Sequence, residues 1–223
     1  MSAASPEVAI VDDHQLLALS LAMALQSDGH GARVVPVARR SVESLAQDAT
    51  TATVAVVDLD LGPGPDGLPR DGAELLPHLR AAGVPTVVLT GDQDLARWGE
   101  CLDNGAVTVL PKHERLERLV DAVADLLRGR LVAQPAWRAD AARAWKDRRA
   151  EREQLLEPLA RLTPREREVL ELLAEGLTVT EITQRDVVSV PTVRTQVRNV
   201  LAKLGVTSQL QAVALLSRAR ACR

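Results

Sequence analysis

Short valine-rich runs alternate with helical patterns along the first 128 residues of the chain. The apolar runs are continuous, four to six residues long, and lie at 8–11, 32–37, 53–57, 84–89 and 107–110. Runs of this kind are typical of strands that are buried on both faces of a parallel sheet. Helices are predicted at 16–25, 42–47, 73–82, 92–104 and 114–128. Five strands that alternate with five helices indicate an α/β fold built on a doubly wound, five-stranded parallel sheet.

A second pattern begins near residue 159, where short helices follow one another and each opens with its own capping signal. Thr163, Thr178 and Ser208 are each followed three residues later by Glu or Gln, which is the capping-box pattern. Ser189, followed by Pro191, is a weaker helix start. These signals predict a small all-α domain of four helices after the sheet domain.

The third of these helices, predicted at 190–204, has an apolar side and a basic side. Val193, Val197 and Leu204 recur at helical spacing on the apolar side. The candidates for DNA contact are Thr192, Arg194, Thr195, Gln196, Arg198, Asn199 and Lys203. Arginine can bind guanine in the major groove, and cationic or amide groups can bind phosphates. With a short helix at 179–185 and a turn at 186–188, the pattern predicts a helix-turn-helix that binds double-stranded DNA.

Three motifs in this segment resemble the tetrahelical helix-turn-helix of the LuxR/FixJ/NarL class of bacterial regulators. They are LTPREREVLELLAEGL at 162–177, Thr192-Val193, and KLGV at 203–206. The sequence departs from the usual residues of the class at Thr183, Asp186, Gln196 and Gln209. The alternative interpretation is a helical bundle whose basic faces are merely solvated.

Charge is divided unevenly along the chain. Residues 1–128 carry 10 Lys and Arg against 19 Asp and Glu, residues 129–158 carry 7 against 5, and residues 159–223 carry 10 against 6. A basic C-terminal domain is expected of a DNA-binding protein. Its excess of positive charge is moderate and gives one monomer limited affinity, so a homodimer is expected.

Polar side chains stand at the ends of four of the predicted strands. They are Asp12, Asp13, Asp58, Thr90 and Lys112. Function in an open parallel sheet collects at the carboxyl ends of the strands, so these groups are expected to converge. Crowded carboxylates repel each other unless a hard cation such as Mg²⁺ neutralises them. One carboxylate can then act as a nucleophile toward a phosphoryl group, while the hydroxyl and the amine bind its oxygens.

Four motifs resemble the flavodoxin-like receiver domain of two-component response regulators. They are VDDH at 11–14, VVDLDLG at 56–62, VLTGD at 88–92 and VLPKH at 109–113. The resemblance implies that Asp58 accepts a phosphoryl group from a histidine kinase and that Thr90 and Lys112 contact it. It also implies that Asp13 and Asp58 bind Mg²⁺ through their side chains, Asp60 through its backbone carbonyl, and Asp12 through a metal-bound water. Both resemblances together indicate a response regulator of the NarL/FixJ class.

Three features depart from typical receivers. Val109 stands where the family has an aromatic switch residue, and Pro111 precedes Lys112. The loop 61–72 is long and contains four glycines and three prolines. This loop is interpreted as surface decoration, with a lid over Asp58 as the alternative.

The predicted domains are a receiver at 1–128, a helical linker at 129–158 and the helix-turn-helix domain at 159–223. One side of the linker helix carries Trp137, Ala141, Ala144, Trp145, Leu155, Leu156 and Leu159, interrupted by Arg148 and Arg152. It either shields its tryptophans against one of the chain's own domains or forms a dimer.

The remaining composition excludes several classes of protein. Cys101 and Cys222 are isolated and support neither a disulfide framework nor a zinc site. No apolar stretch is long enough to span a bilayer and no signal peptide is recognised, so a cytoplasmic protein without a membrane partner is expected. The chain has no Phe and no Tyr, so Val, Leu and Ala must fill its cores beside three Trp.

The sequence thus predicts a phosphorylation-controlled, DNA-binding transcriptional regulator, the output component of a two-component system. No enzymatic activity beyond slow autodephosphorylation is expected. The alternative is a DNA-binding regulator that is constitutive or controlled by a ligand or protein, with a receiver that phosphorylation does not switch.

Overall fold

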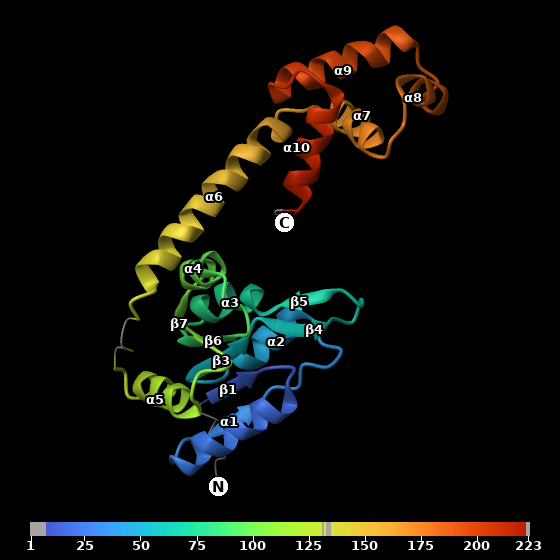
Figure 1. The fold of residues 1–223 in the computed structure, drawn as a ribbon. Coiled ribbons are helices and arrows are strands. Elements are labelled where there is room, and N and C mark those ends of the chain that lie inside the picture. Colours follow the sequence, from blue (N-terminus) through green and yellow to red (C-terminus); the bar gives the residue numbers. More distant parts are fainter. Residues whose placement is uncertain (1–7, 131, 133–134, 222–223) are drawn as a thin grey trace. The chain divides into compact units, whose positions relative to one another are not determined.

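Five parallel strands form the centre of the first part of the molecule (Figure 1). The structure, a computed structural model, describes residues 8–130, 132 and 135–221. The strands are β1 (Val8–Val11), β2 (Ala32–Val34), β3 (Val54–Asp58), β6 (Thr86–Thr90) and β7 (Ala106–Pro111), in the order β2-β1-β3-β6-β7. The predicted sheet is confirmed. The second strand ends earlier than predicted, because Pro36 has no N–H to continue the ladder after Val35 bonds to Ile10.

Helices cover both faces of this sheet, as the doubly wound prediction requires. Helices α1 (Gln15–Ser27) and α5 (Leu116–Leu127) pack on one face, where Leu21, Leu25 and Val123 are fully buried. Helices α2 (Val42–Ala49), α3 (Leu76–Ala81) and α4 (Leu95–Asp103) pack on the other. A 3₁₀ turn, η1 (Gly72–Leu75), precedes α3, where the sequence predicts one helix. The continuous valine runs are therefore buried from both sides.

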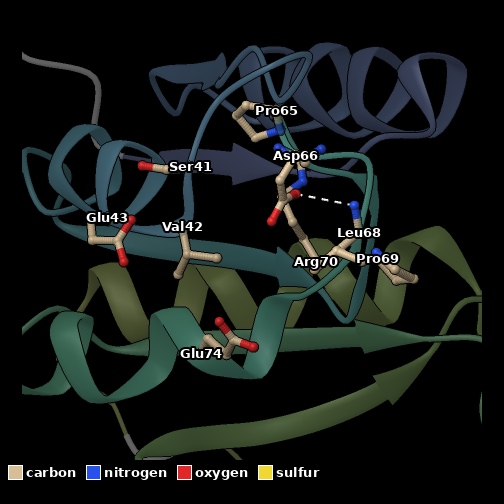
Figure 2. Close-up of a pocket in the computed structure, with 10 residues that line it drawn as sticks. Ser41, Val42, Glu43, Pro65, Asp66, Leu68, Pro69, Arg70 and Glu74 are labelled. Carbon is tan, nitrogen blue, oxygen red and sulfur yellow. Dashed lines mark hydrogen bonds between the residues drawn. The ribbon is translucent and has the colours of Figure 1, made fainter.

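The Gly/Pro-rich loop forms an antiparallel hairpin that the sequence did not predict. Its strands are β4 (Asp60–Pro63) and β5 (Pro69–Asp71). Arg70 is buried and donates to the carbonyl oxygens of Val37 (2.6 Å) and Arg40 (2.7 Å), and also to that of Leu61. Figure 2 shows this arginine beneath the hairpin turn, beside the start of α2. The hairpin is thus fastened to the sheet domain.

Two glycines, one in the hairpin and one directly after it, are required by close approaches. Gly62 has a φ of 63°, and a Cβ there would lie 3.1 Å from an oxygen of Asp13. A Cβ on Gly72 would overlap the backbone carbonyl of Asp58. Gly62 of β4 therefore lies against Asp13, and Gly72, the first residue of η1 directly after the hairpin, lies against the end of β3. The neighbouring Asp71 is ion-paired with Arg97 of α4.

Helix α6 (Arg138–Ala160) begins on the sheet domain. Its Ala141 is fully buried in a cluster with Trp98 of α4, and Arg138 donates to the carbonyl of Val107 at 2.9 Å. The molecule divides into two units within this helix, between Lys146 and Asp147. The linker residues Trp137 and Trp145 are half-buried against the first unit. The predicted dimer and the predicted boundaries at 128 and 158 stay predictions.

The second unit contains the predicted capped helices. They are α7 (Pro164–Ala174), α8 (Val179–Asp186), α9 (Val190–Leu204) and α10 (Gln209–Ala221). Thr163 with Glu166 and Thr178 with Glu181 form complete capping boxes. In front of α10 the Gln211 amide accepts from the N–H of Thr207 rather than from that of Ser208.

Two departures from the usual helix-turn-helix residues have partners in this unit. Asp186 is ion-paired with Arg165 of α7 at 2.6 Å, so it joins α8 to α7. The Thr183 hydroxyl donates to the carbonyl of Thr180 at 2.6 Å, so this hydroxyl has a hydrogen-bond partner although Thr183 is buried. Both residues are therefore accommodated by the fold.

Two expectations from the sequence concern the cysteines and membrane-spanning segments, and the described residues bear on both. Burial raises the pKa of Cys101 to about 12, so little thiolate forms at neutral pH; Cys222 lies outside the described residues. Among those residues, no single helix is long and apolar enough to cross a membrane. Helices α9 and α10 together reach that length and apolar character, but the pair is bent by 59°.

Replacing Gly72 by Ala should lower the unfolding free energy of the sheet domain by about 1–3 kcal/mol, because the new methyl group displaces the backbone at the end of β3. Urea denaturation measures this. Gly91→Ala is the matched control, since nothing lies within 4 Å of a Cβ there. Equal stability of both variants would mean that the hairpin does not lie against Asp58.

Candidate functional site

The carboxyl ends of the strands bring the predicted polar groups to one cleft. Asp12 follows β1, Asp58 ends β3, Thr90 ends β6 and Lys112 follows β7. A cleft of about 650 Å³ is lined by Asp58, Thr90 and Lys112 together with residues of the hairpin and of α4. The predicted convergence is therefore present in the structure.

One lysine contacts two buried carboxylates at the floor of this cleft. The Lys112 Nζ lies 2.5 Å from Oδ2 of Asp58 and 3.3 Å from Oδ1 of Asp12. Asp58 is 1% exposed and Asp12 is 3% exposed. Pro111 ends β7 and does not prevent Lys112 from reaching the cluster.

Burial sets the acidity of Asp58. Desolvation and the neighbouring charge of Asp12 raise its pKa from 3.8 to about 6, although the hydrogen bond from Lys112 acts in the opposite direction. Burial alone would lower the pKa of Lys112, but its hydrogen bond and charge contacts with Asp58 and Asp12 outweigh burial and raise that pKa. Asp58 is therefore mostly ionised at neutral pH and carries a paired charge.

His14 is a member of this cluster that the sequence analysis did not select. Its Nδ1 lies 2.7 Å from Oδ1 of Asp13, 3.4 Å from Oδ1 of Asp12 and 3.8 Å from Oδ2 of Asp58. Its position directly after the aspartate pair was the available signal. The same ring nitrogen lies 3.1 Å from the Lys112 ammonium, so the imidazole and the lysine contact the same group of carboxylates.

The same cluster has the donor set of a divalent cation site. Ligand atoms of Asp12, Asp13, His14 and Asp58 all lie within 4.8 Å of one another. Oδ2 of Asp12 is buried and has no hydrogen-bond partner, which is costly without a cation or donor facing it. Oxygen ligands at this density fit Mg²⁺. The Asp60 carboxylate is not in the cluster and accepts from the N–H of Gly62 at 3.1 Å, while the Asp60 backbone N–H faces Asp58.

Thr90 and Val109 lie on the neighbouring strands β6 and β7, and only Thr90 has a polar side chain. Thr90 is buried, and its Oγ1 accepts a hydrogen bond from the N–H of Asp92 at 3.0 Å. The Val109 side chain is fully buried in the cluster that also contains Trp98. It carries no polar group and therefore cannot form a hydrogen bond with the Thr90 hydroxyl.

The candidate DNA-binding residues lie on α9. Arg194, Thr195, Arg198 and Asn199 are exposed, as is Thr192, which shares a hydrogen bond with Ser189 at the helix start. Gln196 is half-buried. The ammonium of Lys203 lies 2.6 Å from Glu166 of the α7 capping box. Within the described part of the chain, the exposed Arg194 and Arg198 of α9 form no ion pair. Lys203 is already ion-paired with Glu166 of α7.

Comparison with known families assigns both units. Residues 8–124 match the family described as response regulator receiver domain, and residues 160–216 match bacterial regulatory proteins of the luxR family. The chain belongs to the response regulators of the NarL/FixJ class. It is 34% identical over 211 residues to the DNA-binding transcriptional activator DevR/DosR of Mycobacterium tuberculosis, covering 92% of this chain and 91% of that protein.

Two further relatives extend over nearly the whole response regulator. The probable transcriptional regulatory protein NarL of Mycobacterium tuberculosis is 32% identical over 227 residues, covering 99% of each chain. The virulence factors putative positive transcription regulator BvgA of Bordetella pertussis is 27% identical over 215 residues, covering 95% of this chain and 97% of its own. This response regulator therefore combines a receiver with a LuxR-type DNA-binding domain, as the sequence motifs predict.

The raised pKa of Asp58 predicts a pH-dependent stability. In the folded receiver the Asp58 carboxyl stays protonated up to about pH 6, whereas in the unfolded chain it ionises near pH 3.8. Ionisation of Asp58 therefore lowers the free energy of unfolding as the pH rises from about 4 to about 6. In a chelator, Asp58→Asn should therefore be more stable than wild type at neutral pH, by up to about 3 kcal/mol.

The advantage of Asp58→Asn should shrink as the pH falls from about 6 to about 4. Urea denaturation at several pH values measures it, with Asp60→Asn as the exposed control. A variant that is less stable than wild type at pH 7 would show that Lys112 outweighs burial and repulsion at this site.

Proposed function

We propose that Asp58 accepts a phosphoryl group from a histidine kinase and that the phosphoryl group controls binding of α9 to double-stranded DNA. The observation that carries this proposal is the 2.5 Å contact between Lys112 and Asp58 at the floor of the cleft. A carboxylate that serves only structure would not need an open cleft before it. Asp58 is paired with Lys112 and lines a cleft of about 650 Å³.

The chemistry follows from the groups at the cleft. A carboxylate oxygen of Asp58 attacks phosphorus, the bond between phosphorus and the donor nitrogen breaks, and an acyl phosphate forms. Lys112 then moves its hydrogen bond from Asp58 to a phosphoryl oxygen, and the Thr90 hydroxyl donates to another. Slow hydrolysis of the acyl phosphate would reset the receiver.

Mg²⁺ would be held by the side chains of Asp13 and Asp58, by Asp12 through water, and by the backbone carbonyl of Asp60. Bound there, it neutralises the negative charge that donor and acceptor bring together. The unpartnered Oδ2 of Asp12 and the spacing of the carboxylates support this ligand set. His14 Nδ1 lies within 4.8 Å of these carboxylate oxygens and could serve as a further ligand.

For DNA, we assign base contacts to Arg194, Thr195 and Arg198, and flanking contacts to Thr192, Gln196 and Asn199. Lys203 would contact phosphate only after it leaves Glu166, because its ammonium is paired with that carboxylate. The moderate positive charge of the domain supports binding as a homodimer, since one monomer neutralises few phosphates. We place this activity in the cytoplasm.

A second function is favoured by Val109. Its buried, apolar side chain lacks the group that usually reports phosphorylation, which is compatible with a receiver controlled by a ligand or protein instead. The complete set of Asp12, Asp13, Asp58 and Lys112 at the cleft supports the first function.

Replacing Asp58 by Asn should abolish labelling by acetyl phosphate in the presence of Mg²⁺, because an amide is not a nucleophile for phosphorus. Labelling is measured by the phosphate-dependent mobility of the protein in gels or by intact mass. Asp60→Asn is the matched control and should be labelled as wild type is. Labelling of Asp58→Asn at another residue would sink the assignment.

Replacing Arg194 or Arg198 by Ala should weaken specific DNA binding by about 1–3 kcal/mol if each arginine makes a bidentate base contact. Fluorescence anisotropy with an operator selected from random DNA measures this at fixed salt. Arg161→Ala removes the same charge outside α9 and should change the affinity little. Unchanged affinity in both α9 variants would remove α9 as the recognition helix.

A further inference from the structure

All three tryptophans of the chain gather where α6 lies on α4. The Trp98 and Trp137 rings meet edge to face, with centroids 4.8 Å apart and planes at 73°. The indole N–H of Trp145 donates to Asp103 at 3.3 Å. We name this set, together with Gly99 and Ala141, the tryptophan contact. Because the chain has no Tyr or Phe, its aromatic groups are concentrated at one contact.

Gly99 makes the tryptophan contact unusually close. A Cβ on Gly99 would overlap the carbonyl of Ala141 and would lie 2.7 Å from Cβ of Trp145. Glycine inside a helix costs about 1 kcal/mol relative to alanine, so α4 gives up stability at this position. The cost is explained by the approach of α6, which any larger residue would push away.

Hydrogen bonds connect this contact to the phosphoacceptor cleft. The Thr90 hydroxyl oxygen accepts from the N–H of Asp92 at 3.0 Å, and the carbonyl of Asp92 accepts from the indole N–H of Trp98 at 2.9 Å. The two ends of a single residue thus join Thr90 to Trp98. Movement of the Thr90 hydroxyl toward a phosphoryl group would pull away from Asp92 and loosen the carbonyl that holds the indole.

We propose that the tryptophan contact is a latch that holds the start of α6 on α4 and opens when Asp58 is phosphorylated. The proposal rests on the function assigned to Asp58 above. Trp98 takes the place of the aromatic residue that Val109 does not supply. Opening of the latch frees residues 138–146 from the receiver, and α6 continues without a break into the second unit.

Intrinsic fluorescence of the full chain tests the latch directly, because every tryptophan belongs to it. Beryllofluoride serves as the phosphoryl mimic, with Mg²⁺, and its binding is followed separately by fluorine NMR. The expected result is a red shift of the tryptophan emission as beryllofluoride binds, since the indole rings leave the tryptophan contact and become exposed to water. Bound fluoroberyllate with unchanged emission overturns the latch, whereas no bound fluoroberyllate overturns the function assigned to Asp58.

Two conservative variants separate the hydrogen-bonded path from simple packing. Trp98→Phe keeps a ring but loses the N–H that bonds to Asp92, so fluoroberyllate should bind while the emission of the other two tryptophans no longer shifts. Trp145→Phe is the matched control, because its N–H bonds to Asp103 and not to Asp92, and its shift should persist. A full shift in Trp98→Phe contradicts the path.

Gly99→Leu should open the latch without any phosphoryl mimic. Its emission should already be red-shifted and should change no further when fluoroberyllate binds. Emission equal to wild type would mean that α6 does not approach Gly99. Binding of beryllofluoride, followed by fluorine NMR, shows whether the receiver of this variant is folded. If it is not folded, the result with Trp98→Phe tests the latch instead.

Discussion

The ion pair between Lys112 and the buried Asp58 is the interaction on which the rest of the receiver depends. It places a carboxylate at the end of a central strand, where burial makes ionisation costly, and compensates it with a lysine from the edge strand β7. Asp12 shares the same lysine, so the charge balance is incomplete until a cation or a donor arrives. Under the proposed function, such a site loses stability in the free protein and gains the capacity to bind a phosphoryl group.

The hairpin and helix α4 lie next to this ion pair. The hairpin that replaces a typical loop lies against Asp58 through Gly72 and is tied to α4 through Asp71 and Arg97. It is not detached decoration, since Arg70 also fastens it to the loop after β2. The cleft beside Asp58 is therefore lined both by residues of the hairpin and by the loop from Thr90 to α4.

The features that could be predicted from sequence are those with local causes. Valine runs indicate buried strands, and the Thr163 and Thr178 capping boxes mark helix starts, because a few neighbouring residues decide each of them. The convergence of Asp58, Thr90 and Lys112 followed from strand order alone. The pairing of Lys203 with Glu166 and the approach of α6 to Gly99 depend on residues distant in sequence, as does the attachment of the hairpin through Arg70, so no local pattern predicts them.

The central claim is that chemistry at Asp58 decides whether α9 binds DNA. The most direct measurement is the affinity of the full chain for a selected operator with and without beryllofluoride, compared with the same pair of measurements on Asp58→Asn. The account predicts that beryllofluoride changes the affinity of the wild type and leaves Asp58→Asn unaffected. Equal affinity of the wild type in both conditions, with beryllofluoride shown to be bound, would contradict it and favour a receiver controlled by something other than phosphorylation.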